Sequence, residues 1–134
     1  MLKKLVLSID DAKSAAAACR AEAERNNWNV VIAILDDGGH LMYLERMDGV
    51  QKASSRIAIQ KGETAIMFKR PSGAMEKVVA GGRIAVMSLG ATTVEGGVPI
   101  VVDGEYVGAI GVSGVQSHED AQVAQAGVDL LTKK

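Results

Sequence analysis

Residues 95–120, EGGVPIVVDGEYVGAIGVSGVQSHED, predict a β-hairpin that runs directly into a helix. Asp103 and Gly104 fit the two central positions of a type I′ turn, because both positions need a positive φ. Counting outward from this turn pairs Ile100 with Val107. The stretch therefore predicts two neighbouring antiparallel strands followed by a helix, and the rest of the sheet has to be built around them.

Glycines recur along the second strand of this hairpin and just after it. Gly108, Gly111 and Gly114 leave parts of the sheet without side chains, where another backbone or a flat ligand can approach closely. Ser117 fits the N-cap of the last helix, with Asp120 three residues later as its partner in a capping box. Because a strand, a glycine break and a helix start converge here, we expect a ligand to bind at this point.

Turn residues and apolar periodicity divide the rest of the chain into helices and strands. In order, these are a helix opened by Ser8 and ended by Asn26-Asn27, a strand over 30–35, a returning strand over 40–46, helices over 54–68 and 72–79, and a strand over 84–89. The run 30–35 is apolar without alternation, which is typical of a central strand covered on both faces. The order predicts an α/β (α+β) sandwich with a mainly antiparallel five-stranded sheet and helices on both faces.

Composition limits the classes of function. The 134 residues suit a single domain spanning 1–134, and a net charge of −1 gives no footprint for nucleic acid. The longest apolar run, residues 30–35, is too short for a membrane span, and the N-terminus lacks a signal-peptide pattern, so we expect a cytoplasmic protein. The single cysteine, Cys19, lies at helical spacing from alanines and is expected to be buried.

Lys61 stands out on the second predicted helix because its neighbours on the same face are apolar. Two explanations are open for such a lysine. Its aliphatic stem can lie along the apolar surface while the ammonium reaches solvent, or the ammonium can point into a pocket. The adjacent Gly62 weakens the helix and suggests close packing at that turn.

Two familiar catalytic or phosphate-binding motifs are incomplete. The sequence around Ser113 has Val115 where the nucleophile elbow of a serine hydrolase needs a second glycine. Gly111 and Gly114 form a G-x-x-G without full dinucleotide or Walker spacing, and Glu119 adds negative charge to the start of the following helix. We therefore expect neither a serine hydrolase nor a nucleotide site.

The chain contains two histidines, His40 and His118, so a closed zinc site would lack its usual ligand set. One imidazole is enough to hold haem iron. His40 follows the Asp36-Asp37-Gly38-Gly39 turn, whereas His118 lies in the first turn of the last helix. Residue type and position alone favour a solvated polar residue over a ligand for each histidine.

Several ordered blocks of sequence resemble the GlcG/HbpS family over essentially the whole chain. They are Asp36-Asp37-Gly38-Gly39-His40-Leu41, Arg46-Met47-Asp48, Lys61-x-x-Thr64-Ala65, Glu95-Gly96-Gly97-Val98-Pro99-Ile100, Gly108-Ala109-Ile110-Gly111-Val112-Ser113-Gly114 and Asp120. One departure is Gly62, where the family pattern has alanine. The resemblance implies a profilin-like sandwich, a homo-oligomer that is often an octamer, and a relation to haem-binding and haem-degrading proteins and to glycolate-utilisation loci.

Our leading hypothesis is an oligomeric protein that binds a small ligand, with haem or a related tetrapyrrole as the ligand that the resemblance implies. The residues expected to contact it are Lys61, Thr64, Gly96, Gly97, Gly111, Ser113 and Gly114. His40 is the expected iron ligand, and His118 is the second candidate.

Two other hypotheses belong to different classes. The protein could be an enzyme or accessory protein acting on a small carboxylate of the glycolate type, with Lys61 as the anion anchor and Asp120 or Glu95 as a general base. It could also be an assembly module without catalysis. The sequence leaves open whether the protein is an enzyme.

Overall fold

The computed structural model describes residues 1–133, and the helices and strands below belong to that part of the chain. The elements, in order, are α1 (Ile9–Arg25), β1 (Val31–Asp36), β2 (Leu41–Arg46), α2 (Ser54–Met67), α3 (Ser72–Ala80), the 3-10 helix η1 (Ile84–Leu89), β3 (Gly97–Val102), β4 (Glu105–Ser113) and α4 (Ser117–Thr132).

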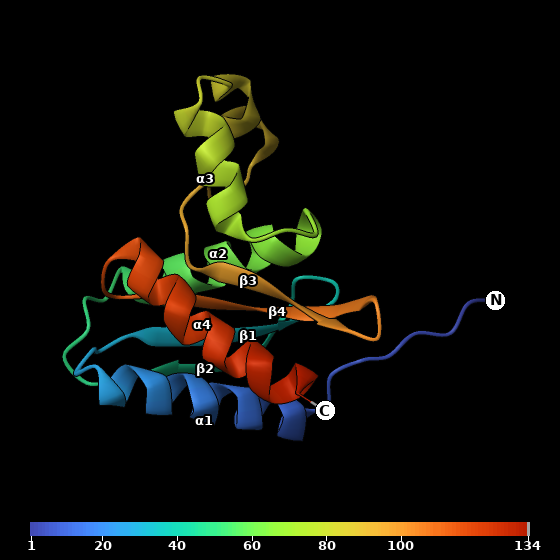
Figure 1. The fold of residues 1–134 in the computed structure, drawn as a ribbon, viewed down its shortest axis with the longest axis vertical. Helices are drawn as coiled ribbons and strands as arrows, with labels where there is room; N and C mark the ends of the chain where they lie inside the picture. Colours follow the sequence, from blue (N-terminus) through green and yellow to red (C-terminus); the bar gives the residue numbers. More distant parts are fainter. Residues whose placement is uncertain (134) are drawn as a thin grey trace.

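The four strands form one antiparallel sheet in the order β2-β1-β4-β3. Helices α1 and α4 cover one face of this sheet and α2 covers the other (Figure 1). Side chains of β1 alternate between the two cores, since Ile32 and Ile34 pack with α1 and α4, whereas Ala33 and Leu35 pack toward Ala58 of α2. The prediction of a central strand covered on both faces is confirmed.

The predicted five-stranded sheet is wrong in one element, because the described sheet has four strands. The apolar run 84–89 forms η1, which lies with α3 in a projection that stands away from the layered body (Figure 1). We call residues 71–94 the arm. No strand of the sheet lies beside η1 to accept its backbone hydrogen bonds, so an apolar run that is typical of a strand takes a helical form.

The predicted hairpin turn is confirmed, with Asp103 at φ 50° and Gly104 at φ 79°. Its predicted register holds only next to the turn. The register shifts between Ile100 and Val101, so Ile100 pairs with Gly108 and not with Val107. Such a β-bulge inserts one extra residue into a strand and cannot be read from the turn residues.

Helix α4 begins with a different cap from the predicted one. Gln116 is the N-cap residue, and its capping box is completed by Glu119. Ser117 and Asp120 therefore do not form the predicted pair, which leaves the Asp120 carboxylate available for a partner in the interior. The Ser8 cap of α1 is confirmed, with Asp11 as its reciprocal partner.

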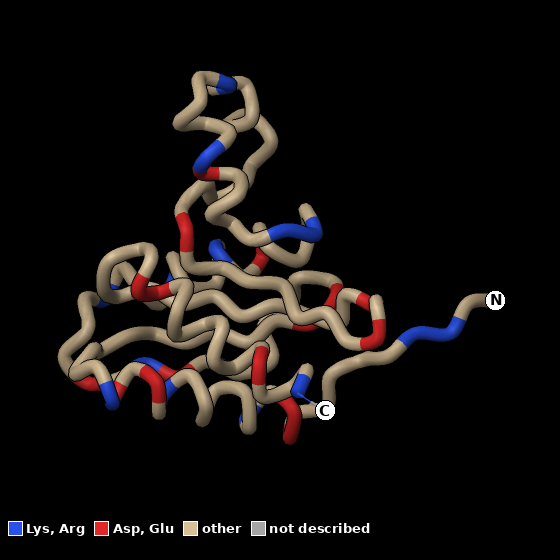
Figure 2. Tube along the Cα trace, in the orientation of Figure 1, with Lys and Arg blue, Asp and Glu red and all other residues tan. Residues whose placement is uncertain are grey.

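Acidic and basic residues are interspersed over the body of the molecule (Figure 2). Within residues 1–133, no helix combines the length and the apolar character needed to span a bilayer.

Candidate functional site

A buried ion pair lies where α2, β4 and α4 meet. Lys61 Nζ donates a hydrogen bond of 2.9 Å to Asp120 Oδ2 and one of 3.1 Å to the carbonyl oxygen of Val112. The Lys61 and Asp120 side chains are only 3% and 2% exposed. The explanation in which the Lys61 ammonium reaches solvent is therefore wrong. The ammonium points into the interior, where the Asp120 carboxylate neutralises its charge.

The second oxygen of Asp120 is also used, because Oδ1 accepts a hydrogen bond from the backbone N–H of Val115 at 3.1 Å. Burial raises the pKa of the Asp120 carboxyl above its ordinary value, while Lys61 and the Val115 N–H act in the opposite direction. A small carboxylate substrate at Lys61 would have to displace Asp120 from both partners.

Three further hydroxyl groups of this region are satisfied internally. Thr64 Oγ1 accepts a hydrogen bond from the Thr92 N–H at 2.8 Å, and Ser72 Oγ accepts one from the Gly97 N–H at 2.8 Å. Ser113 Oγ donates to Ser54 Oγ at 3.0 Å. These contacts fasten the segment before β3, and the end of β4, to α2 and α3.

The glycines of the predicted site let backbones approach closely. A Cβ at Gly111 would overlap the carbonyl oxygen of Ala58, and one at Gly97 would overlap the carbonyl oxygen of Lys61. A Cβ at Gly96 would come within 2.8 Å of Lys61 Nζ. Helix α2 therefore occupies the space beside these glycines in which we expected a flat ligand.

The remaining glycine of the set, Gly114, lies farther along, where a Cβ would meet the carbonyl oxygen of Asn29 at 2.6 Å. The departure at Gly62 has a related physical reason. A Cβ at Gly62 would overlap Leu35 and lie 3.1 Å from the Gly111 nitrogen, so a glycine on the helix faces a glycine on the strand.

Thr64 connects this buried cluster to the surface. It lines a hollow of about 300 Å³ between the C-terminal half of α2 and the end of η1. We call this the α2–η1 hollow, and its lining residues are Glu63, Thr64, Met67, Phe68, Leu89 and Gly90. Met67 and Leu89 are 60% and 59% exposed, so apolar groups face solvent there.

His40 lies at the opposite end of β1 from the buried ion pair. Its side chain is 80% exposed, and Nδ1 is 3.3 Å from Asp36 Oδ1. The same carboxylate oxygen accepts the backbone N–H groups of Gly38 and His40, each at 2.9 Å. Although burial raises the pKa of Asp36, these hydrogen bonds and the nearby imidazole lower it overall. An anionic Asp36 can thus orient the ring through Nδ1, as carboxylates do behind metal-bound histidines.

His118 is exposed in the first turn of α4, which follows the end of β4. Asp36 pairs with Gly108 and Val31 pairs with Ser113, so the two histidines lie near opposite ends of the strand pair. Six residues of strand separate those ends by about 20 Å. One chain therefore cannot bring both histidines to the same iron.

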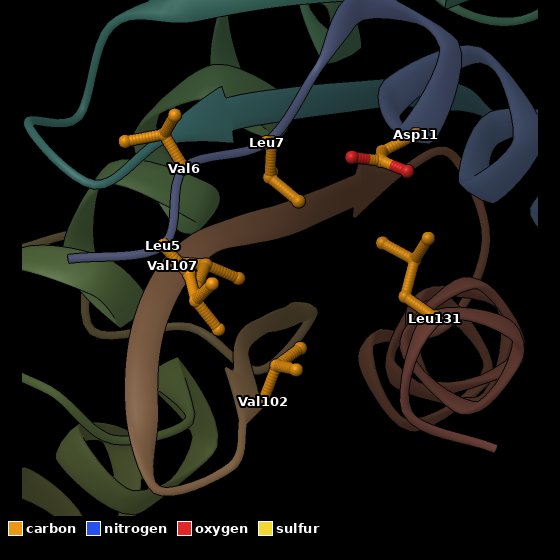
Figure 3. Close-up of a pocket in the computed structure, with 7 residues that line it drawn as sticks. All are labelled: Leu5, Val6, Leu7, Asp11, Val102, Val107 and Leu131. Atoms are coloured by element: carbon orange, nitrogen blue, oxygen red, sulfur yellow. The ribbon is translucent and has the colours of Figure 1, made fainter. Parts of the chain in front are cut away.

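A second apolar cavity, of about 210 Å³, lies under the N-terminal segment (Figure 3). Its lining is aliphatic except for one carboxylate, and consists of Leu5, Val6, Leu7, Asp11, Val102, Val107 and Leu131. Asp11 already accepts the Ser8 N–H in the cap of α1. The cavity therefore offers an aliphatic surface and little polar recognition.

Comparison with known proteins places this geometry in a family. The model of the family described as "Haem degrading protein HbpS-like" matches residues 7–129. The chain belongs to the HbpS-like family. Protein GlcG of Escherichia coli is 44% identical over 114 residues, which are 84% of this chain and 85% of GlcG.

Solved structures agree with this assignment. A double mutant of HbpS from Streptomyces reticuli has a TM-score of 0.89 at 29% identity, with 98% of this chain and 90% of that chain covered. A PduOC:haem complex has a TM-score of 0.83 at 27% identity, with 92% of this chain and 94% of that chain covered.

In this HbpS-like chain, the sequence-predicted site residues fall into separate places. Lys61, Thr64, Gly96, Gly97 and Gly111 lie together around α2. His40 follows Gly39, which lies against Glu63 and Met67 toward the C-terminal end of the same helix, whereas His118 lies in the first turn of α4.

Sequence reasoning named Asp120 as a helix-cap partner and as a possible general base, but it did not predict the ion pair with Lys61. The sequence did contain a signal for this ion pair. A buried lysine requires a buried anion, and Asp120 directly precedes the apolar stripe of α4.

Proposed function

We propose that the protein binds haem or a related tetrapyrrole. The observation that carries this proposal is membership of a family described by haem degradation, supported by a structural relative that was solved as a haem complex. Breakdown of the bound haem is part of the same proposal. We also propose that the protein acts in the cytoplasm as a homo-oligomer, up to an octamer.

His40 is the proposed iron ligand. Two features support it: the imidazole is 80% exposed, and its Nδ1 lies 3.3 Å from the Asp36 carboxylate. A carboxylate behind a histidine fixes the ring tautomer and raises the basicity of the other nitrogen, as is usual for metal-bound histidines. His118 has no such carboxylate among its described contacts and is the second candidate.

The proposal gives the other predicted residues distinct roles. Thr64 is the member of the set that lines the α2–η1 hollow, so it is the one proposed to touch the ligand directly. Lys61, Ser113 and the glycines at 96, 97, 111 and 114 are proposed to hold α2 and the strand ends in place beneath the ligand surface.

Titration of the apo protein with haemin tests the proposal. We expect a shift of the Soret band that saturates near one haem per chain, followed by loss of the band in air with ascorbate as the reductant. The His40→Ala variant should lose or alter the shift, and His118→Ala is the matched control that should bind as the wild type does. Absence of any shift contradicts haem binding, and an unchanged shift in His40→Ala contradicts the ligand assignment.

A further inference from the structure

A polar hollow of about 480 Å³ lies at the C-terminal end of α1. We call it the Trp28 hollow. Its walls come from α1, from the loop that leads to β1 and from the loop that follows β2, and they include Arg20, Glu24, Asn27, Trp28, Asn29 and Asp48. The hollow precedes β1, whereas His40 follows β1, so the hollow and the proposed iron ligand lie at opposite ends of this strand (Figure 1).

The backbone holds Trp28 in a fixed place. Asn27 takes the left-handed conformation, at φ 58°, where α1 ends. The N–H of Trp28 donates to the carbonyl oxygen of Ala23 at 2.9 Å, and the N–H of Asn27 donates to that of Glu24 at 3.1 Å. These are the two hydrogen bonds of a Schellman motif, in which an apolar residue packs back on the last turn of the helix. An aliphatic residue would also satisfy this motif, so the motif alone does not require an indole.

Carboxylates outnumber basic groups at the hollow. Arg20 Nη1 donates a hydrogen bond of 2.9 Å to Glu45 Oε2, and the Tyr43 hydroxyl donates one of 3.0 Å to Oε1 of the same carboxylate. Glu45 therefore neutralises Arg20. Glu24 contacts Arg20 only at 3.4 Å, and Asp48 forms no ion pair with another residue of the described 1–133 segment. Two carboxylates are thus left for a ligand.

Two amide side chains add further acceptors. Asn27 and Asn29 both line the hollow, and neither side chain forms a hydrogen bond with the part of the chain that the structure describes. Each amide carbonyl can accept a hydrogen bond from an N–H or O–H group of a ligand. The polar wall therefore offers negative charge and acceptor oxygens beside an aromatic ring.

An aromatic ring beside carboxylates suits an organic cation. A cation over an indole is attracted by the ring quadrupole, and tryptophan is the best of the aromatic residues for this contact. We propose that the Trp28 hollow binds a small organic ammonium cation, with its charged group against the Trp28 indole and with Asp48 and Glu24 as counter-charges. The two carboxylates disfavour an anion. The inference is independent of haem, because it uses none of the residues proposed to bind the tetrapyrrole.

Titration of the apo protein with choline, followed by tryptophan fluorescence, tests the proposal. The chain has one tryptophan, so the emission reports on this hollow alone. We expect a saturable change with choline. The matched neutral probe is 3,3-dimethylbutan-1-ol, which has the same shape with carbon in place of the charged nitrogen. It should bind at least about tenfold more weakly, because it lacks the cationic contact.

Variants assign the effect to the proposed residues. Asp48→Asn removes a counter-charge with little change of shape and should weaken choline binding at least about threefold. Asp10→Asn, at an exposed position in the first turn of α1, is the matched control and should bind as the wild type does. Trp28→Leu keeps an apolar residue for the Schellman motif and should abolish binding, measured by isothermal titration calorimetry.

Far-UV circular dichroism checks that each variant is folded, and Asp48→Asn and the neutral probe remain decisive where Trp28→Leu does not fold. Four results overturn the proposal, whatever the haemin titration shows. They are absence of saturation with choline, equal binding of the neutral probe, equal loss in Asp10→Asn, and saturation with glucose but not with choline, which would assign the hollow to a neutral sugar.

Discussion

Lys61 joins three elements from inside the molecule, because its ammonium contacts the Asp120 carboxylate and the Val112 carbonyl. Lys61→Met would leave Asp120 buried opposite an apolar group. Removing one partner of a buried pair typically costs about 3–5 kcal/mol. We expect a loss of this size in the free energy of unfolding, measured by urea denaturation.

The control for this prediction removes both charges at once. Lys61→Met combined with Asp120→Leu replaces the pair by apolar groups, which is often close to neutral in stability. The double variant should therefore regain most of the loss, apart from the hydrogen bond to the Val115 N–H. A single variant that loses less than about 1 kcal/mol would show that the pair is not held in the interior.

Two carboxylates predict opposite pH dependences. The pKa of Asp120 is raised by burial, so its contribution to stability is complete below its unfolded pKa and is lost as pH rises through the folded pKa. The pKa of Asp36 is lowered on balance, because hydrogen bonds to its carboxylate outweigh the opposing effect of burial. Its contribution is present above the unfolded pKa and is lost as pH falls through the folded pKa.

Urea denaturation across the acid range measures both effects against matched amide variants. As pH falls, the wild type should gain stability relative to Asp120→Asn and lose stability relative to Asp36→Asn. The same sign for both differences would contradict the two environments.

At the scale of elements, two positions of the β3–β4 hairpin require glycine for different physical reasons. Gly104 needs a positive φ, and a Cβ there would meet no atom within 4 Å. Gly111 lies where α2 crosses β4, and a Cβ there would overlap Ala58. We expect Gly104→Ala to cost about 1–2 kcal/mol of unfolding free energy, from the left-handed backbone alone.

For the matched variant Gly111→Ala, we expect a loss of about 3 kcal/mol or more, because helix and strand have to separate. Thermal denaturation of both variants compares them under the same conditions. Equal losses would mean that the close approach of α2 does not decide the need for glycine at position 111.

These elements also show what the sequence could reveal. The turn at Asp103-Gly104 and the cap at Ser8 are local, so their residues predict them correctly. The apolar run 84–89 predicts a strand because a run of apolar residues is typical of a buried strand, whereas this run forms the 3-10 helix η1, in which Val86 is the buried residue. The Lys61–Asp120 pair spans 59 positions, and each residue could be noticed singly, but only the fold shows that they meet.

At the scale of the whole molecule, the layered body and the arm differ in how they are stabilised. Strands β1 and β4 are buried on both faces by helices of the same chain. The predicted layers are confirmed because the helices and strands of this body cover one another, so the apolar pattern of the sequence reflects contacts within the same chain. The predicted ligand contacts combine residues of several elements, so no single stretch of sequence specifies them.

The last prediction follows from that difference and concerns hydrogen exchange. If a second copy covers the arm, amides of η1 should be protected at high protein concentration and exchange rapidly on dilution below the dissociation constant. Amides of β1 and β4 should exchange slowly at both concentrations. Mass spectrometry of peptides covering 81–90 and 31–36 makes this comparison within one sample. Protection of η1 that does not depend on concentration would assign the order of the arm to the single chain.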